Sequence, residues 1–130
     1  MKLEIVTPIR RMGEVEATEV VVPGEAGEFG ILPGHKPFLA ALGTGALTYN
    51  SGGKPVALMV SGGLAEVLED RVLLLAEYMQ PADEIDLSEA QRTLEEIERQ
   101  LKSLPPDGED TKSLSARLDR WHARIAVRKS

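Results

Sequence analysis

The chain has 130 residues, and its 21 acidic against 15 basic side chains give a net charge of −6. This excess of acid argues against a general nucleic-acid-binding protein, whose surface is rich in lysine and arginine. The absence of cysteine excludes disulfide bonds, thiolate metal sites and cysteine nucleophiles. The longest apolar runs, such as residues 72–76, are far shorter than the roughly 20 residues of a membrane span. No apolar leader follows Met1, so we expect a soluble, cytoplasmic protein without a transmembrane segment.

Glycine, valine and charge divide the chain into two regions. Eleven of the 12 glycines and nine of the ten valines lie in residues 1–85. Gly-punctuated, β-branched sequence is typical of strands joined by tight turns. Residues 1–85 also carry the whole net charge of −6, whereas residues 86–130 are neutral overall. We therefore predict two units, residues 1–85 and residues 86–130.

The first unit is predicted to consist of short strands. We expect strands at residues 3–7, 14–23, 46–50, 56–61, 64–68 and 71–77, with turns at residues 50–53, 61–63 and 69–70. Many short strands at close spacing favour an antiparallel sandwich or flattened β-barrel. No helix-length periodic segment interrupts them, which argues against an alternating β–α–β arrangement.

The second unit is predicted to be an antiparallel helical hairpin, which makes the chain α+β. Apolar residues recur at spacings of three and four over residues 87–104, as on one face of a helix. Asp86 precedes this segment and is expected to cap the helix, and the prolines at 105–106 are expected to end it. A second helix is predicted from about residue 111 to 128, with Trp121 on its apolar side. So small a hairpin should dock on the β unit, dock on another protein, or alternate between them.

The second helix carries four arginines at spacings of three, four and four, which place them on one face. They are Arg117, Arg120, Arg124 and Arg128. One interpretation is a solvated face whose cations suit the C-terminal end of a helix. The other is a surface for an acidic protein partner, because positive charge is concentrated here in an acidic chain.

The sequence contains no arrangement typical of an enzyme or a metal site. His35 and His122 lie in different units, and no His, Asp and Glu set has metal-ligand spacing. Ser61 lacks the preceding glycine of a nucleophile elbow. The glycines of residues 24–30 lack the Gly-Lys-Ser/Thr ending of a phosphate-binding loop, so we expect them to serve tight turns. We therefore expect no catalytic residue and no resident cofactor.

The glycine-rich segment VVVPGEAGEFGILPGHKP, residues 20–37, resembles the signature of the epsilon subunit of the bacterial and chloroplast F-type ATP synthase. SGGLAEV at residues 61–67 and VLLLAE at residues 72–77 agree with it, as does the junction at residues 84–86. The resemblance covers the whole chain in order. It implies a flattened β-barrel and a helical hairpin in the central rotor, which couples proton translocation to ATP synthesis without catalysing a reaction itself.

The resemblance also implies partners and a location. The barrel would bind the gamma subunit and the ring of c subunits, peripherally at the cytoplasmic face of the bacterial plasma membrane. Glu28 matches the acidic loop position that faces the c ring, and His35 matches the loop histidine near the gamma and c-ring contact. With Phe29, they make the loop of residues 24–37 a candidate interface. The alternative is that the Gly and Pro residues only shape turns and that His35 caps a neighbouring strand.

In this family the hairpin lies folded on the barrel or extends into the alpha/beta hexamer, where it blocks ATP hydrolysis. The basic face resembles the C-terminal helix that meets an acidic segment of beta. Some members bind ATP on the folded hairpin through an Ile/Leu-Asp-x-x-Arg-Ala motif. Asp86, Arg92 and Arg99 are candidates for such a site. Glu89 stands where the motif has arginine, and its carboxylate argues against tight binding of a phosphate.

Overall fold

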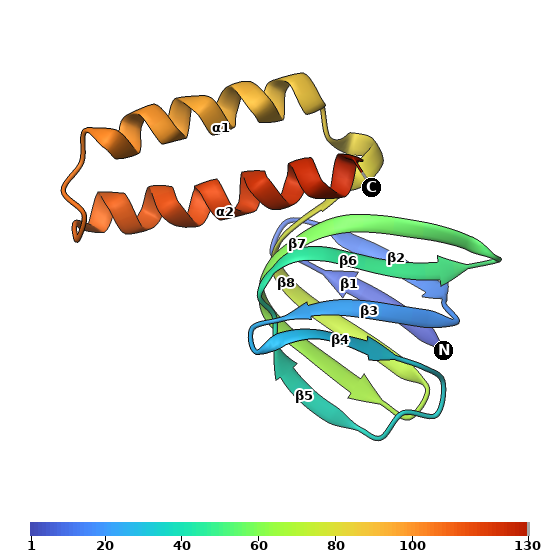
Figure 1. Cartoon of the computed structure of the whole chain (residues 1–130). Helices are drawn as coiled ribbons and strands as arrows, with labels where there is room; N and C mark the ends of the chain where they lie inside the picture. The colour runs from blue at the N-terminus through green and yellow to red at the C-terminus, as the bar shows by residue number, and fades with distance from the viewer. Residues whose placement is uncertain (130) are drawn as a thin grey trace.

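The computed structural model describes residues 1–129 and places a sandwich of strands beneath two stacked helices (Figure 1). The strands are β1 (Lys2–Val6), β2 (Arg11–Glu16), β3 (Glu19–Gly24), β4 (Gly27–Ile31), β5 (Phe38–Ala41), β6 (Thr44–Ser51), β7 (Lys54–Leu68) and β8 (Arg71–Pro81). The 3₁₀ turn η1 (Ala82–Glu84) leads into the helices α1 (Leu87–Lys102) and α2 (Glu109–Lys129). The predicted α+β class, with a helical hairpin after a strand-rich unit, is confirmed.

The strands form one sheet in the order β2-β1-β8-β7-β6-β3-β4, with β5 paired on β7. The pairing is antiparallel except between β1 and β8, which run parallel and which the sequence analysis did not anticipate. Alternate side chains of each strand point inward and make one apolar core. Its fully buried members include Leu3, Ile5, Val20, Val22, Ile31, Leu47, Leu58, Val60, Val67 and Leu74.

The turn predicted at residues 61–63 is wrong, because these residues lie within β7. The first half of β7 pairs with β6 and the second half with β5, while β8 runs beside both halves. Gly62 and Gly63 have φ angles of +70° and +117°. A Cβ atom on Gly63 would lie 1.8 Å from the carbonyl oxygen of Leu75. The glycine pair therefore bends one continuous strand where its partner approaches closely.

The segment predicted as a loop at residues 24–37 is partly a hairpin of β3 and β4. Gly24 pairs with Gly27 across its turn, and only residues 32–37 connect β4 to β5 outside regular strands. A Cβ atom on Gly24 would lie 2.7 Å from the carbonyl oxygen of Gly27, so glycine fits this tight closure. The single strand predicted for residues 14–23 is also wrong, because β2 and β3 are separate strands.

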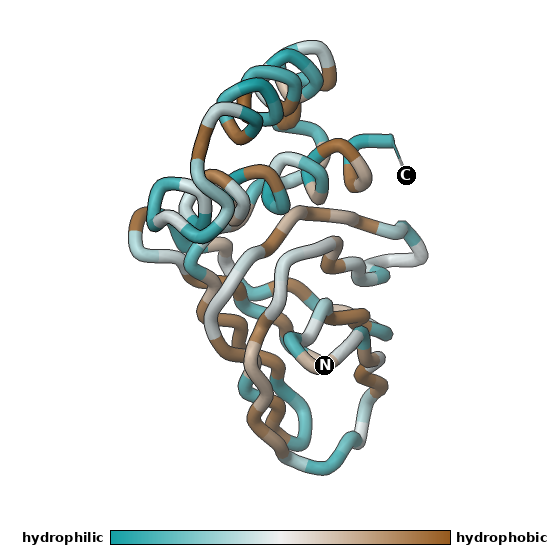
Figure 2. Tube along the Cα trace, turned by 60° about the vertical axis from the view of Figure 1, so that its left-hand side comes forward, coloured by the Kyte–Doolittle hydropathy of each residue, from teal (hydrophilic) through white to brown (hydrophobic). Residues whose placement is uncertain are grey.

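The hairpin begins where the sequence predicts. Asp86 caps α1, with its Oδ1 accepting a hydrogen bond of 3.1 Å from the backbone N–H of Glu89. α2 packs over β6 and β7, and α1 packs on the far side of α2 (Figure 1). Figure 2 shows the same stacking from another side, with apolar segments concentrated in the strands. The hairpin is therefore docked on the sandwich, through α2.

The docked hairpin and the sandwich share a second, smaller apolar cluster. Its buried members are Met59, Ile85, Ala90 and Val127. Around them lie mainly alanines of both units, together with Trp121 and Ile125. Because alanine side chains are small, α2 lies close to the sheet, but each contact buries little apolar area.

Candidate interaction surfaces

The β3–β4 end of the sandwich carries the three residues predicted to meet the c ring and gamma. Glu28 is exposed on β4, whereas Phe29 is half-buried and packs on the core. Adjacent residues of a strand point to opposite faces. The ring of Phe38 contacts both Phe29 and His35. Its centre lies 5.3 Å from the ring centre of Phe29 and 5.0 Å from that of His35. The structure thus joins Phe29 and His35 through Phe38, which the sequence analysis missed, and separates them from the Glu28 carboxylate.

His35 is presented on the connection of residues 32–37. Its backbone N–H donates to the carbonyl oxygen of Leu32 at 3.2 Å, which closes a turn containing Gly34 at φ +83°. Its ring Nδ1 lies 3.0 Å from the carbonyl oxygen of Lys36, an acceptor within the same connection. The imidazole is exposed and therefore accessible to a partner.

An exposed apolar face covers the outside of β5, β7 and β8, and the sequence analysis missed it. Strand register places its members on one side: Ala41 pairs with Leu64, and Leu64 pairs with Leu75. Leu39 and Leu68 lie two and four positions along the same strands. The four leucines, Leu39, Leu64, Leu68 and Leu75, are 43–63% exposed. Intervening residues such as Ala65 and Leu74 point into the core.

This apolar face has the character of a protein-binding surface. Single exposed leucines are ordinary, but several gathered on one face mark an interaction site. Here they surround Glu66, which is exposed and pairs with Leu39. Ile9, which is 96% exposed, projects from the nearby connection between β1 and β2. The continuous apolar run of residues 72–76 was the sequence signal for a strand with apolar side chains on both of its faces.

The basic face of α2 is used within the chain in this conformation. The Arg120 guanidinium lies 4.1 Å from the centre of the Tyr78 ring. Arg124 Nε donates to Gln80 Oε1 at 2.8 Å, and Arg128 Nε donates to the carbonyl oxygen of Ile85 at 3.1 Å. Three of the four arginines therefore contact β8 or the linker that follows it, so a purely solvated face is not what the structure shows.

Arg124 is half-buried. Its guanidinium also lies over the ring of Trp121, at 4.3 Å from the ring centre. Burial, followed by the nearby positive charges of Arg120 and Arg117, lowers the pKa of Arg124 below its ordinary value. The basic face is thus an arginine cluster with mutual repulsion, which an acidic group would relieve.

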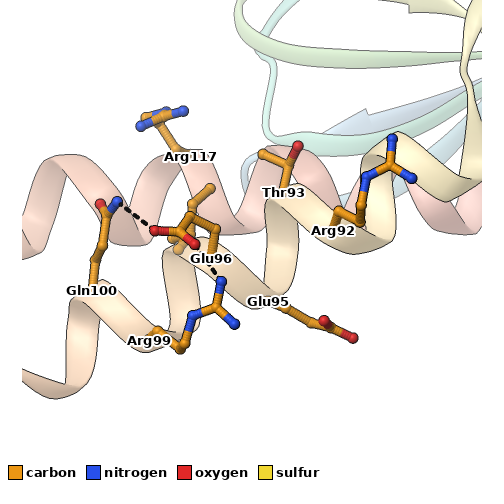
Figure 3. A pocket seen from close by; sticks show the side chains of 8 residues that line it. Arg92, Thr93, Glu95, Glu96, Arg99, Gln100 and Arg117 are labelled. Atoms are coloured by element: carbon orange, nitrogen blue, oxygen red, sulfur yellow. Dashed lines mark hydrogen bonds and ion pairs between the residues drawn. The ribbon is translucent and has the colours of Figure 1, made fainter.

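A hollow between α1 and α2 gathers two of the three residues predicted for a nucleotide site (Figure 3). Arg92, Arg99 and Arg117 line it. Arg99 forms an ion pair with Glu96, whose other oxygen accepts from Gln100 Nε2 at 3.3 Å. The hydrogen bond from Arg99 is the main cause that lowers the pKa of Glu96. Asp86 does not line this hollow; it caps the start of α1.

Two further properties bear on the chemistry available to the chain. Among residues 1–129, no group of three or more His, Asp or Glu side chains is arranged to hold a metal ion. No helix in the same part of the chain is long and apolar enough to cross a membrane.

Comparison with known proteins places the chain in a family. The family model described as "ATP synthase, Delta/Epsilon chain, beta-sandwich domain" matches residues 1–82. The ATP synthase epsilon chain of Trichlorobacter lovleyi is 41% identical over 127 residues, covering 98% of this chain and 92% of that protein. That of Solibacter usitatus is 42% identical over 127 residues, covering 98% and 94%.

Solved structures share the fold. A chain of the Euglena gracilis mitochondrial ATP synthase, from an assembly of OSCP, F1 and c-ring, has a TM-score of 0.83 at 24% identity, over 95% of this chain and 78% of that chain. A chain of the Tetrahymena thermophila mitochondrial ATP synthase central stalk and c-ring has a TM-score of 0.61 at 12% identity, over 98% and 95%. Because the sandwich model matches and the bacterial relatives align along nearly the whole chain, this protein belongs to the ATP synthase epsilon chain family and is a non-catalytic subunit.

Proposed function

We propose that the chain is a central-stalk rotor subunit of an F-type ATP synthase, which couples proton translocation to ATP synthesis at the cytoplasmic face of the bacterial plasma membrane. The observation that carries this proposal is the exposed leucine face on a sandwich of the epsilon family. Solved chains of the same fold come from mitochondrial ATP synthase assemblies described as OSCP, F1 and c-ring, and as central stalk and c-ring. A subunit that transmits rotation needs firm binding surfaces rather than a reaction centre.

The sandwich would use two surfaces in that complex. The leucine face suits the gamma subunit, because burial of several large apolar side chains gives a durable contact. The end that carries Glu28 and His35 suits the polar loops of the c ring, because both side chains are exposed there. The two surfaces would fix the sandwich between gamma and the ring.

Binding to gamma tests the first surface. We expect Leu75→Ser to weaken binding of the full chain to its gamma subunit by about tenfold, the effect of losing one well-packed interface side chain. Tyr78→Ser is the matched control, since Tyr78 is 44% exposed on the same strand, compared with 46% for Leu75, but contacts Arg120 of α2. Titration calorimetry gives both affinities. Equal affinities for the two variants would rule out the leucine face as the gamma contact.

We further propose that the hairpin can leave the sandwich and inhibit ATP hydrolysis in the alpha/beta hexamer. The small, alanine-rich cluster beneath α2 supports this, because it holds the hairpin by less apolar area than a typical domain core. The arginine cluster supports an acidic partner such as a segment of beta, because opposite charge would relieve the repulsion around Arg124.

Changing the four arginines of α2 to glutamine distinguishes their role in docking from a role in contacting beta, because the two losses change inhibition of ATP hydrolysis in opposite directions. The change weakens the docked state, in which Arg124 and Arg128 contact the sandwich and linker, and this alone would increase inhibition. Loss of a contact with beta would decrease inhibition. We expect ATP hydrolysis by the assembled enzyme to rise, and an unchanged or lower rate would contradict a contact between this face and beta.

A second candidate function is ATP sensing on the folded hairpin. The observation that favours it is that three arginines, Arg92, Arg99 and Arg117, line one hollow. Glu96 neutralises part of that charge through Arg99, so we expect weak binding. Titration of the chain with Mg-ATP should give tighter binding for Glu96→Gln than for the original chain. Absence of heat in both would eliminate this function.

A further inference from the structure

The linker between β8 and α1 sets the direction in which the hairpin leaves the sandwich. It consists of η1, Ile85 and the capping residue Asp86. Ile85 is only 4% exposed and packs in the small cluster with Met59 and Val127. Because α1 begins directly after Asp86, any contact that fixes η1 also fixes the start of the hairpin.

Arg10, near the N-terminus, forms an ion pair with Glu84 of this linker. The two terminal nitrogens of Arg10, Nη1 and Nη2, donate to Glu84 Oε1 and Oε2, each at 2.7 Å. Two parallel bonds of this kind fix orientation as well as distance. Arg10 belongs to the connection between β1 and β2, 74 positions before Glu84. The pair therefore ties the first strands of the sandwich to the linker.

The backbone at both residues of this pair is itself fixed by hydrogen bonds. The Arg10 backbone N–H donates to Thr7 Oγ1 at 2.9 Å, and the Arg10 carbonyl accepts from the Thr7 backbone N–H at 2.7 Å. On the other side, the Glu84 carbonyl accepts from Gln80 Nε2 at 3.2 Å. The planar guanidinium is pre-organised for the two oxygens of a carboxylate, so less side-chain entropy is lost for each hydrogen bond formed. The hydrogen bond from Arg10 also lowers the pKa of Glu84.

Two further polar contacts near the linker involve α2. Arg124 bonds Gln80 and Arg128 bonds Ile85, so both bonds are lost as soon as α2 leaves the sheet. The Arg10–Glu84 pair contains no residue of either helix. We propose that this pair is a hinge clasp, which holds the linker in the orientation of the docked hairpin and thereby opposes swinging of the hairpin away from the sandwich.

The clasp is a property of the isolated full-length chain, so its test does not depend on the proposed place in an ATP synthase. Arg10→Gln removes the fork and keeps a polar side chain. The matched control is Arg11→Gln, since Arg11 is the next residue, has a side chain that is 71% exposed, and forms its ion pair with Glu4, at 3.8 Å, and not with the linker. Both positions are on the surface, and circular dichroism checks that the sandwich and helices are retained.

Amide hydrogen exchange measured by mass spectrometry reports hairpin opening. We expect exchange in α2 to accelerate about two- to fivefold in Arg10→Gln, the range that exposed ion pairs produce. Glu84→Gln should behave in the same way, whereas Arg11→Gln should match the original chain. Exchange in the core strands should not change, because the clasp acts on the hinge and not on the sandwich.

Charge exchange and high salt act directly on the interaction between Arg10 and Glu84. The charge-exchanged chain, with Arg10→Glu and Glu84→Arg together, should restore slow exchange if the two side chains act on each other. In 1 M salt the original chain should approach Arg10→Gln, because screening acts over about 3 Å there. The clasp is refuted if Arg10→Gln and Arg11→Gln exchange alike, or if the charge exchange leaves α2 as open as the single variants.

Discussion

The apolar interior is divided into a sandwich core and a smaller cluster beneath α2. We therefore predict that the same side-chain truncation has different effects in the two places. Val67 lies in the sandwich core and Val127 lies in the small cluster, and each is 1% exposed. Changing either valine to alanine removes two buried carbon groups. The two variants therefore remove the same buried groups at the same burial. They differ in the cluster that they weaken and in the element that carries them, since Val67 lies in β7 and Val127 in α2.

The magnitude follows from the buried carbon. At about 0.8 kcal/mol for each buried CH₂, the loss is about 1.6 kcal/mol, to which an unfilled cavity adds. Val67→Ala should lower the free energy of global unfolding by at least this amount. Val127→Ala should instead raise the population of the undocked hairpin by about tenfold or somewhat more, since 1.4 kcal/mol is a factor of ten.

Hydrogen exchange distinguishes these outcomes in one experiment. In Val127→Ala the amides of α2 should exchange about tenfold faster, while the slowest amides of β7 and β8 keep their rates. In Val67→Ala the slowest amides of β7 and β8 should exchange faster than in the original chain. If Val127→Ala accelerates the sandwich strands as much as α2, the hairpin and the sandwich unfold as one cooperative unit, and the argument for an independently detachable hairpin fails.

Other changes test the bend, the hinge and the c-ring end. Gly63→Ala should lower the free energy of unfolding of the sandwich, measured in urea, by about 3 kcal/mol or more, because the new Cβ would clash with the Leu75 carbonyl and because the residue has a positive φ. Gly13→Ala should change this free energy little, since the space around Gly13 is open. Because Arg10 lowers the pKa of Glu84, the clasp should act at pH values above the ordinary pKa of 4.5 and should be lost as the pH falls through the lowered pKa. Amide exchange in the hairpin of the original chain should therefore match that of Glu84→Gln in acid and be slower at neutral pH. Glu28→Lys should reduce ATP-driven proton pumping by the assembled enzyme, and intact pumping would exclude Glu28 from the ring contact.

Local patterns along the chain determined the two units and the ends of the first helix. Apolar spacing of three and four requires one buried helix face, and a side chain such as Asp86 satisfies the first free N–H groups whatever the rest of the fold does. Short-range rules also gave the strand-rich unit. They failed at Gly62-Gly63, because two glycines permit either a turn or a bend, and the neighbouring strands β5 and β6 decide which forms.

The sequence by itself thus determined an acidic strand-rich unit, a helical hairpin with a basic second helix, and the resemblance to the epsilon subunit. Only the tertiary structure decided that the basic face turns toward β8 and the linker, that four leucines share one exposed face, and that Arg10 reaches Glu84. The reason is physical: capping and periodicity act within a few residues. Strand register and helix docking join positions dozens of residues apart, and those contacts form only when the whole chain packs.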